Sequence, residues 1–451
     1  MENTVLSIAD RFNNWIANSI IIKLLSIGFL ILILLIPSAW IESLIQERQV
    51  RSEEVISEIS DKWSGEQTLL GPVLVIPFTK TEKVKTVKNN VQVEEIFESE
   101  HRAYFLPEQL HVESKLTPQV LHRGIFDAVV YDSKTSLTTK FSDPDFSKWN
   151  IPEAQVHWKD AMLVTGISDL RGISENPMIQ SGDKSFVPEP SGDLGLSPSE
   201  AHTSGISTLL GWSSRTDFRS DFSMNLQLKG SELIHFVPTG KTTEVKVGGG
   251  WASPSFDGAM LPTSRTVNEK DFSATWKVLS FNRPFSQQWM DHEQSLKGSE
   301  FGVRLLIPAD QYQQSIRTAK YGVLVIILAF MALFLVELTA KIRIHPFQYI
   351  LIGAALTIYY TLLLSLSEHL GYNVAYVIAS LSTIILLAFY SMTFLIQRSL
   401  VILFTLLMSL FYTFIFVIIQ AEDYSLLIGS VGLFIIIATI MYFSRNIRWY
   451  K

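Results

Sequence analysis

Long apolar segments lie near both ends of the chain, and a long polar stretch separates them. One apolar segment, Leu24–Ile41, stands near the N-terminus. Five more follow residue 320, and these are Tyr321–Ala340, Phe347–Leu366, Val374–Ile396, Ser399–Ile419 and Ser425–Phe443. Each segment is close to the roughly 20 residues that a helix needs to cross about 30 Å of hydrocarbon. The pattern predicts an α-helical polytopic membrane protein with six transmembrane helices.

The polar stretch between the first and second spans has the period of two that is typical of strands. Its alternating runs are Val73–Thr79, Val91–Leu106, Leu110–Leu116, Ile125–Tyr131, Ser136–Phe141, His157–Gly166, Phe222–Leu228, Leu233–Pro238, Thr243–Val247, Phe272–Ser280 and Val303–Ile307. The turn residues Lys88-Asn89-Asn90 predict that the first two runs form a hairpin. Asn176–Ser204 is rich in Ser, Gly and Pro, so we expect a long exposed loop there. The expected fold class adds a large β-rich, sandwich-like domain inserted between helices 1 and 2.

A charged segment with helical spacing, Glu42–Lys62, connects the first span to the first strand. Val55, Ile59 and Trp63 form a narrow apolar stripe, and Gly65 suits a helix stop. We therefore expect a helical stalk that continues out of the membrane. The expected domains are an N-terminal tail (1–19), the first transmembrane helix (20–41), the stalk (42–66), the β-rich domain (67–319), five transmembrane helices (320–443) and a C-terminal tail (444–451).

The positive charges of the short loops indicate the orientation in the membrane. Basic residues follow spans two, four and six, and these are Lys341, Arg343, Arg398, Arg445, Arg448 and Lys451. The loops 367–373 and 420–424 contain no Lys or Arg. Because cytoplasmic loops carry an excess of Lys and Arg, we expect both termini in the cytoplasm and the β-rich domain outside. The alternative is that the first segment is cleaved as a signal peptide. Pro37 would then occupy position −3 of a cut after Ala39, which argues against cleavage.

Composition and motifs give no sign of catalysis. The chain has no cysteine, so disulfides, thiolate nucleophiles and Cys-based metal sites are excluded. A net charge of −6 argues against binding nucleic acid. No HExxH or HxH pair, GxSxG motif or phosphate-binding glycine loop is present. We therefore expect no enzyme activity, no catalytic residue, no cofactor and no metal.

Two weaker signals in the polar stretch keep structural and functional interpretations open. His101, His111 and His122 are spaced so that they could converge on a metal, although ordinary histidines are the better interpretation. Asp143 and Asp145 flank a proline, which favours a turn over a pair of catalytic carboxylates.

Few ionisable residues lie within the predicted spans, where a charge is costly and therefore informative. Glu337 stands near the cytoplasmic end of span two, with Lys341 four residues later. A structural ion pair between them is the expected role, and a proton relay is the alternative. Glu368 and His369 end span three on the outer side, where they either cap the helix or bind a headgroup, an ion or a partner.

Seven short motifs, in order along most of the chain, resemble those of the CreD family of bacterial inner-membrane, cell-envelope-integrity proteins. They are the segments 70–77, 166–173, 251–256 with 261–262, 308–313, 345–349, 366–369 and 445–450. The motif residues that we flag for family identity or partner binding are Asp169, Arg171, Trp251, Asp310, Gln311, Tyr312, His345, Glu368 and His369. The interpretation of these motifs from their residues is mainly structural. Asp169 and Arg171 are two residues apart, so on a strand they would share a face, and in a turn they could pin the loop by a charge-assisted bond. Gln311 and Tyr312 would anchor the chain at the membrane interface.

The resemblance implies a Gram-negative inner-membrane location, a periplasmic domain and a role in envelope integrity and β-lactam response under a two-component sensor. It supplies no catalytic residues. The expected function is therefore non-enzymatic, with the lipid bilayer as the first partner and other envelope proteins or lipids as further ones. Two alternatives stay open: a transporter or lipid flippase that uses the C-terminal helices, and a membrane-tethered envelope hydrolase. The oligomeric state is not indicated.

Overall fold

The computed structural model describes residues 20–88, 91–192, 194, 204–291, 294–307, 311–340, 342–421 and 424–445. The chain divides into two compact units. We refer to Met1–Glu53 with Ala309–Lys451 as the helical unit, and to Glu54–Pro308 as the β-rich unit. The expected N-terminal tail (1–19), residues 446–451 of the expected C-terminal tail (444–451) and the flagged residue Asp310 lie outside the described residues.

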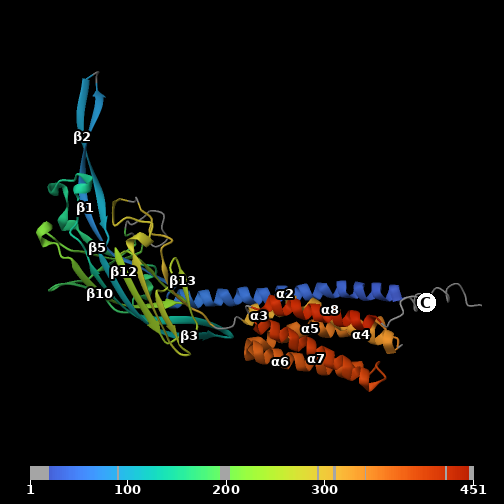
Figure 1. Cartoon of the computed structure of the whole chain (residues 1–451). Coiled ribbons are helices and arrows are strands. Elements are labelled where there is room, and N and C mark those ends of the chain that lie inside the picture. The colour runs from blue at the N-terminus through green and yellow to red at the C-terminus, as the bar shows by residue number, and fades with distance from the viewer. Residues whose placement is uncertain are drawn as a thin grey trace, which may run out of the picture. The chain divides into compact units, whose positions relative to one another are not determined.

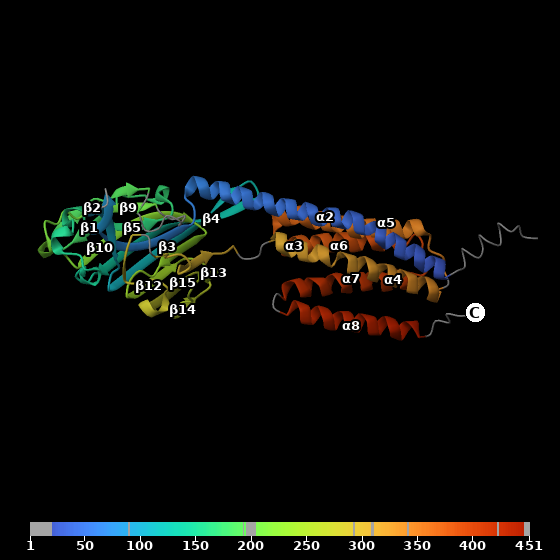
Figure 2. The same ribbon diagram turned by 90° about the horizontal axis from the view of Figure 1, so that it is seen from above.

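The helices begin with α2, which is one continuous helix over Ile20–Trp63. The others are α3 (Gln311–Lys320), α4 (Gly322–Ala340), α5 (Pro346–Leu370), α6 (Tyr372–Ser391), α7 (Arg398–Gln420) and α8 (Ser425–Ser444). Figures 1 and 2 show α4–α8 running side by side. Within the described residues, six helical stretches are long and apolar enough to cross a membrane, with Gln311–Ala340 counted as one. The predicted number of spans is confirmed.

The predicted helical stalk is confirmed, because α2 runs without a break from the first span through Glu42–Lys62. One boundary differs from the sequence prediction. Helix α6 ends at Ser391, five residues before the predicted end, in a turn that leads to α7.

The β-rich unit contains two sheets that include all of its described strands. The first has the order β13-β17-β11-β1-β5-β9-β8, with β2 pairing with β1 and β16. Its strands are β1 (Gln67–Lys88), β2 (Val91–Phe105), β5 (Met162–Ile167), β8 (Glu189–Ser191), β9 (Gly205–Leu209), β11 (Leu233–Val237), β13 (Pro254–Gly258), β16 (Gln288–Met290) and β17 (Phe301–Leu305). The second has the order β14-β15-β12-β3-β4-β10-β6-β7. Its strands are β3 (Gln109–Arg123), β4 (Phe126–Lys140), β6 (Met178–Ser181), β7 (Lys184–Phe186), β10 (Asp221–Ser231), β12 (Thr242–Gly249), β14 (Ser264–Val267) and β15 (Phe272–Leu279).

One apolar core holds the two sheets together, since strands of both contribute buried residues to it. In β3 and β15 buried and exposed positions alternate, so one face of the second sheet meets the core and the other meets solvent. Strand β1 is different, because its stretch Leu69–Ile76 is buried on both faces. A smaller apolar cluster with Tyr104, Phe285 and Trp289 packs against part of it. This double burial explains the unbroken apolar run in the sequence of β1.

The strand predictions are partly confirmed. The hairpin of the first two runs is present, since β1 pairs antiparallel with β2 over Leu74–Lys88. The predicted runs Ile125–Tyr131 and Ser136–Phe141 are wrong as separate strands, because both belong to β4. Asp132-Ser133-Lys134 has the composition of a turn, yet these residues pair with β3 and β10 on either side. The predicted loop Asn176–Ser204 is also wrong over its first half, which forms β6, β7 and β8.

Candidate functional site

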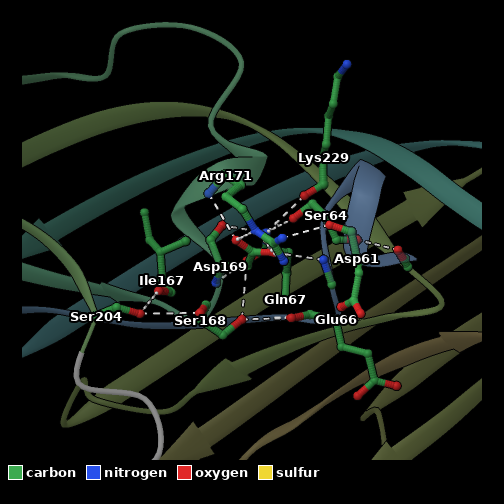
Figure 3. Close-up of polar contacts among 12 residues, drawn as sticks. Asp61, Ser64, Glu66, Gln67, Ile167, Ser168, Asp169, Arg171, Ser204 and Lys229 are labelled. Carbon is green, nitrogen blue, oxygen red and sulfur yellow. Dashed lines mark hydrogen bonds and ion pairs between the residues drawn. The ribbon is translucent and has the colours of Figure 1, made fainter. Parts of the chain in front are cut away.

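A polar network lies in the β-rich unit where α2 ends and β1 begins, and Figure 3 shows it. Asp169 occupies its centre as the N-cap of a short 3-10 turn, Leu170–Gly172. Its carboxylate accepts hydrogen bonds from the backbone N–H of Arg171 at 3.0 Å and of Gly65 at 2.9 Å. We call this network the junction site.

Arg171 closes the junction site from outside. Its Nε donates to Oδ1 of Asp169 at 2.9 Å, and its Nη2 donates to Oδ2 at 2.8 Å. Its Nη1 donates to the carbonyl oxygen of Asp61, in the last turns of α2, at 2.7 Å. The guanidinium therefore joins the carboxylate to the helix end, as charge-assisted fork contacts do. The predicted bond between Asp169 and Arg171 is confirmed.

The electrostatic result is a carboxylate that stays ionised. The hydrogen bond from Arg171 is the largest cause, and the backbone N–H groups of Gly65 and Arg171 add to it, so the pKa of Asp169 falls to about 2. A carboxylate held in this way is deprotonated near neutral pH, so it has no proton to donate, and its basicity is low. The geometry is that of an anchor rather than of an acid–base catalyst.

Gln67 forms the buried floor of the junction site. Its Nε2 lies within 2.9–3.0 Å of Ser64 Oγ and of the carbonyl oxygens of Asp169 and Lys229. Gly172 lies against the same atoms, and a Cβ there would stand 2.4 Å from the Lys229 carbonyl and 2.5 Å from Gln67 Nε2. Position 172 therefore requires glycine, because any larger residue would place its Cβ too close to these atoms.

Further hydrogen bonds from serine connect the neighbouring segments. Ser231 donates to the carbonyl oxygen of Ser64, and Ser168 donates to the carbonyl oxygen of Glu66 at 2.8 Å. Ser204 donates to the carbonyl oxygen of Ile167 at 2.9 Å (Figure 3). Four segments that are distant in sequence thus meet at the end of α2: the start of β1, 166–173, Ser204 and β10–β11.

A second ionic cluster near the junction site was not predicted. Arg304 donates to Glu66 at 2.8 Å and lies 3.5 Å from Glu232 and 3.6 Å from Asp257. Asp257 also contacts His235 at 2.7 Å. Burial is the largest cause that raises the pKa of Glu232. Only strand pairing brings these residues together, so no sequence spacing indicated the cluster.

The helical unit contains two polar contacts that fasten α2 to other helices. Arg48 donates to both oxygens of Glu368, at 2.7 and 2.8 Å, and the Tyr312 hydroxyl donates to Glu368 at 3.2 Å. Near the start of α2, Lys23 pairs with Glu337, which also accepts hydrogen bonds from the Ile344 N–H and the Tyr349 hydroxyl.

These contacts bear on three predictions. Glu337 forms an ion pair with Lys23 of α2, and the expected partner Lys341 lies outside the described residues. Glu368 has a partner within this chain, because its side chain is 8% exposed and bound to Arg48. Tyr312 is buried in α3 against Glu368, and its role as an anchor at the membrane interface stays a prediction.

The other flagged residues have separate local roles. Trp251 Nε1 donates to the Leu306 carbonyl at 2.9 Å, and His345 caps α5 by accepting from the Phe347 N–H at 3.2 Å. Gln311 begins α3, and His369 is exposed near the end of α5. The structure thus places Asp169 and Arg171 together, and Tyr312 with both Glu368 and Gln311, whereas Trp251 and His345 contact other residues.

The three histidines that could have converged do not meet. They contact different acidic residues: His101 contacts Asp291, His111 contacts Glu244 and His122 contacts Asp127. A search of the described residues finds no group of three or more His, Cys, Asp or Glu residues arranged to hold a metal ion. Asp143 pairs with Arg215 and Asp145 accepts from Ser147, so the two carboxylates have separate partners, in a segment that is irregular rather than the predicted turn.

Comparison with known proteins gives one consistent family. Residues 19–450 match the model of the family described as "Inner membrane protein CreD". The Escherichia coli protein of that name is 32% identical over 432 residues, which cover 95% of this chain and 93% of the relative.

Among solved structures, the similarity is small. An M1 zinc metallopeptidase from Deinococcus radiodurans is 10% identical, with a TM-score of 0.20, and covers 48% of this chain and 53% of its own. A mutant of an M1 zinc metallopeptidase from that organism, bound to a Tyr-Ser-Ala substrate, gives a TM-score of 0.21 at 8% identity, over 48% of this chain and 53% of its own. Similarity this low shows no common fold, so no activity is inferred from it.

Proposed function

This chain belongs to the CreD family of inner membrane proteins, and from that premise we propose that it supports cell-envelope integrity and the response to β-lactams without catalysing a reaction. The β-rich unit is the part that acts on the envelope. Its partners in this proposal are the lipid bilayer and other envelope proteins or lipids.

The main support for the proposal is that the single helix α2 contributes residues to both units. Its first residues, to Glu53, belong to the helical unit, where Lys23 and Arg48 pair with glutamates of other helices. Its last turns belong to the β-rich unit, where Arg171 and Asp169 hold the helix end. A continuous helix that contributes to both units supports a β-rich unit tethered to the membrane.

The spacing of the two ion pairs supports a position for the bilayer. Lys23 and Arg48 are 25 residues apart on one helix, which corresponds to about 37 Å. A bilayer core of about 30 Å lies inside that distance, and the interfaces begin near its ends. With the basic loops in the cytoplasm, the Lys23 pair lies at the cytoplasmic boundary, and the Arg48 pair and the β-rich unit lie on the periplasmic side.

A complementation experiment tests the proposal. A deletion strain receives the full-length gene, or full-length Arg171→Ala or Arg215→Ala variants, and uptake of a normally excluded dye and β-lactam survival are measured. We expect leakage in the deletion strain, rescue by the natural protein and by Arg215→Ala, and poor rescue by Arg171→Ala at equal expression. Arg215 is the matched control, since it forms a similar fork with Asp143 and is also exposed, whereas only Arg171 of the two donates to the Asp61 carbonyl of α2. A deletion strain with an intact barrier and unchanged β-lactam survival would overturn the proposal.

One observation favours a second function, that of a transporter or lipid flippase. The helical unit encloses a cluster of tyrosines, with ring centroids 4.7 Å apart for Tyr359 and Tyr412 and 4.8 Å apart for Tyr359 and Tyr360. The buried Tyr412 hydroxyl has no hydrogen-bond partner among the residues that the structure describes, which is costly in a membrane interior. Loss of rescue by Tyr412→Phe at full expression would support transport, because a merely buried hydroxyl is dispensable.

A further inference from the structure

A buried arginine in the β-rich unit stands without an acidic partner. Arg283 is 7% exposed and follows the short 3-10 turn Ser280–Asn282. Other arginines of the unit pair with carboxylates, namely Arg123, Arg171, Arg215 and Arg304. No acidic side chain of the described residues lies within ion-pair distance of Arg283. A buried charge that is neither paired nor fully hydrogen-bonded is costly, so its retention needs a physical explanation.

The contacts of this guanidinium are all with neutral oxygens. Nη1 donates to the Phe285 carbonyl at 2.5 Å and the Ser286 carbonyl at 3.4 Å. Nη2 donates to Gln287 Oε1 at 2.6 Å and lies 3.5 Å from the Thr239 carbonyl. These bonds orient the group, but no carboxylate of the described residues compensates its positive charge. Burial lowers the pKa of Arg283 only to about 10, so the guanidinium is charged at neutral pH.

Two polar groups at this guanidinium have no hydrogen-bond partner among the described residues. They are the buried Nε–H of Arg283 and the hydroxyl of the fully buried Thr239, whose carbonyl lies 3.5 Å from Nη2 of Arg283. Trp289, whose indole N–H is also buried without a partner, belongs to the apolar cluster that includes Phe285. The Arg283 guanidinium lies 4.3 Å from the centre of the Phe285 ring. The groups without a partner can thus donate hydrogen bonds, and they belong to or lie near a cation. A negatively charged acceptor would satisfy both the donors and the charge.

We propose that this corner binds a compact inorganic anion of the chloride type, held by the Nε–H of Arg283 and the hydroxyl of Thr239. The small exposure of both residues and the apolar walls exclude a bulky phosphoester or peptide carboxylate. A water molecule would satisfy the donors but leave the charge unpaired. The anion would fix the segment 283–289 against the end of β11, and this inference stands independently of the proposed function.

Thermal unfolding of the purified full-length protein tests the site. The transition of the β-rich unit is followed by tryptophan fluorescence while sodium chloride replaces sodium gluconate at constant sodium concentration. A bound anion raises the midpoint in a saturable manner, by about 3–6 °C at ten times its dissociation constant. Equal midpoints in the two salts would overturn the proposal.

Two substitutions separate this site from a general salt effect. Thr239→Val removes one donor at nearly constant volume and is expected to raise the half-saturating chloride concentration at least several-fold. Thr165→Val is the matched control, since Thr165 is also buried with an unpaired hydroxyl but belongs to β5, and it should leave the chloride response unchanged. Arg283→Gln, where it folds, should abolish the response. An unchanged response in Thr239→Val would refute the site whether or not Arg283→Gln folds.

Discussion

Asp169 shows how the fold sets the charge of one residue. In the unfolded chain its pKa is near 3.9, and in the folded protein the bonds from Arg171 and Gly65 lower it to about 2. A carboxyl group with a lowered folded-state pKa contributes stability that is fully present above about pH 4. That contribution is lost as the pH falls toward 2.

The first prediction concerns this carboxylate. Asp169→Asn should lower the free energy of unfolding at pH 7 by about 1–2 kcal/mol, because the charge-assisted bonds are lost. The pH dependence of unfolding between about pH 2 and 5 should also become shallower. Denaturant unfolding of the purified full-length protein at several pH values measures both effects. Asp143→Asn, in an exposed pair with Arg215, is the control and should cost less than about 1 kcal/mol.

The second prediction concerns space rather than charge. Gly172→Ala places a methyl group 2.4–2.7 Å from the Lys229 carbonyl, Gln67 Nε2 and Ser64 Oγ. Overpacking of this kind should reduce the free energy of unfolding by about 1–3 kcal/mol. Gly192→Ala is the control, since a Cβ there meets no atom within 4 Å. Equal stability of the two variants would show that the junction site relaxes without cost.

At the scale of elements, the important feature is how α2 is held in the helical unit. Only 11% of the apolar window of α2 is buried, so packing alone fastens this helix weakly. The bidentate contact of Arg48 with Glu368 adds direction as well as attraction, because the guanidinium fork fits the carboxylate in one orientation. Charge pairing therefore sets the register of α2 against α5.

The third prediction tests this pairing by charge exchange. Arg48→Glu and Glu368→Arg should each weaken the contact between α2 and α5, and the double variant should restore most of it. Disulfide cross-linking between introduced cysteines measures the contact, and the absence of natural cysteine makes the background clean. Glu47→Arg, on the exposed side of α2, is the control. Additive loss in the double variant would show that the pair does not set the register.

At the scale of the whole molecule, the orientation in the membrane is the main consequence of the charge pattern. The fourth prediction is that Ser185→Cys, exposed in β7, reacts with a membrane-impermeant maleimide in intact spheroplasts. Ser399→Cys, exposed at the start of α7, should react only after lysis. The reverse labelling pattern would place the β-rich unit in the cytoplasm and contradict the proposed orientation.

The sequence alone determined the number of membrane helices and the β-rich character of the polar stretch. Both depend on the periodicity of apolar residues within short windows, which a helix or a strand imposes by its own geometry. It also identified the bond between Asp169 and Arg171, because two residues of one tight turn are neighbours in any fold that keeps the turn.

Tertiary structure decided the rest, because the remaining contacts join residues that are distant along the chain. Glu337 met Lys23, Glu368 met Arg48, and the partners of Arg304 came together only through strand pairing. The same pairing joined two predicted strands into β4, despite a segment with the composition of a turn. The packing of helices and sheets, rather than local sequence, decides which charged residues pair. It also decides which donor of Arg283 has no acceptor among the described residues.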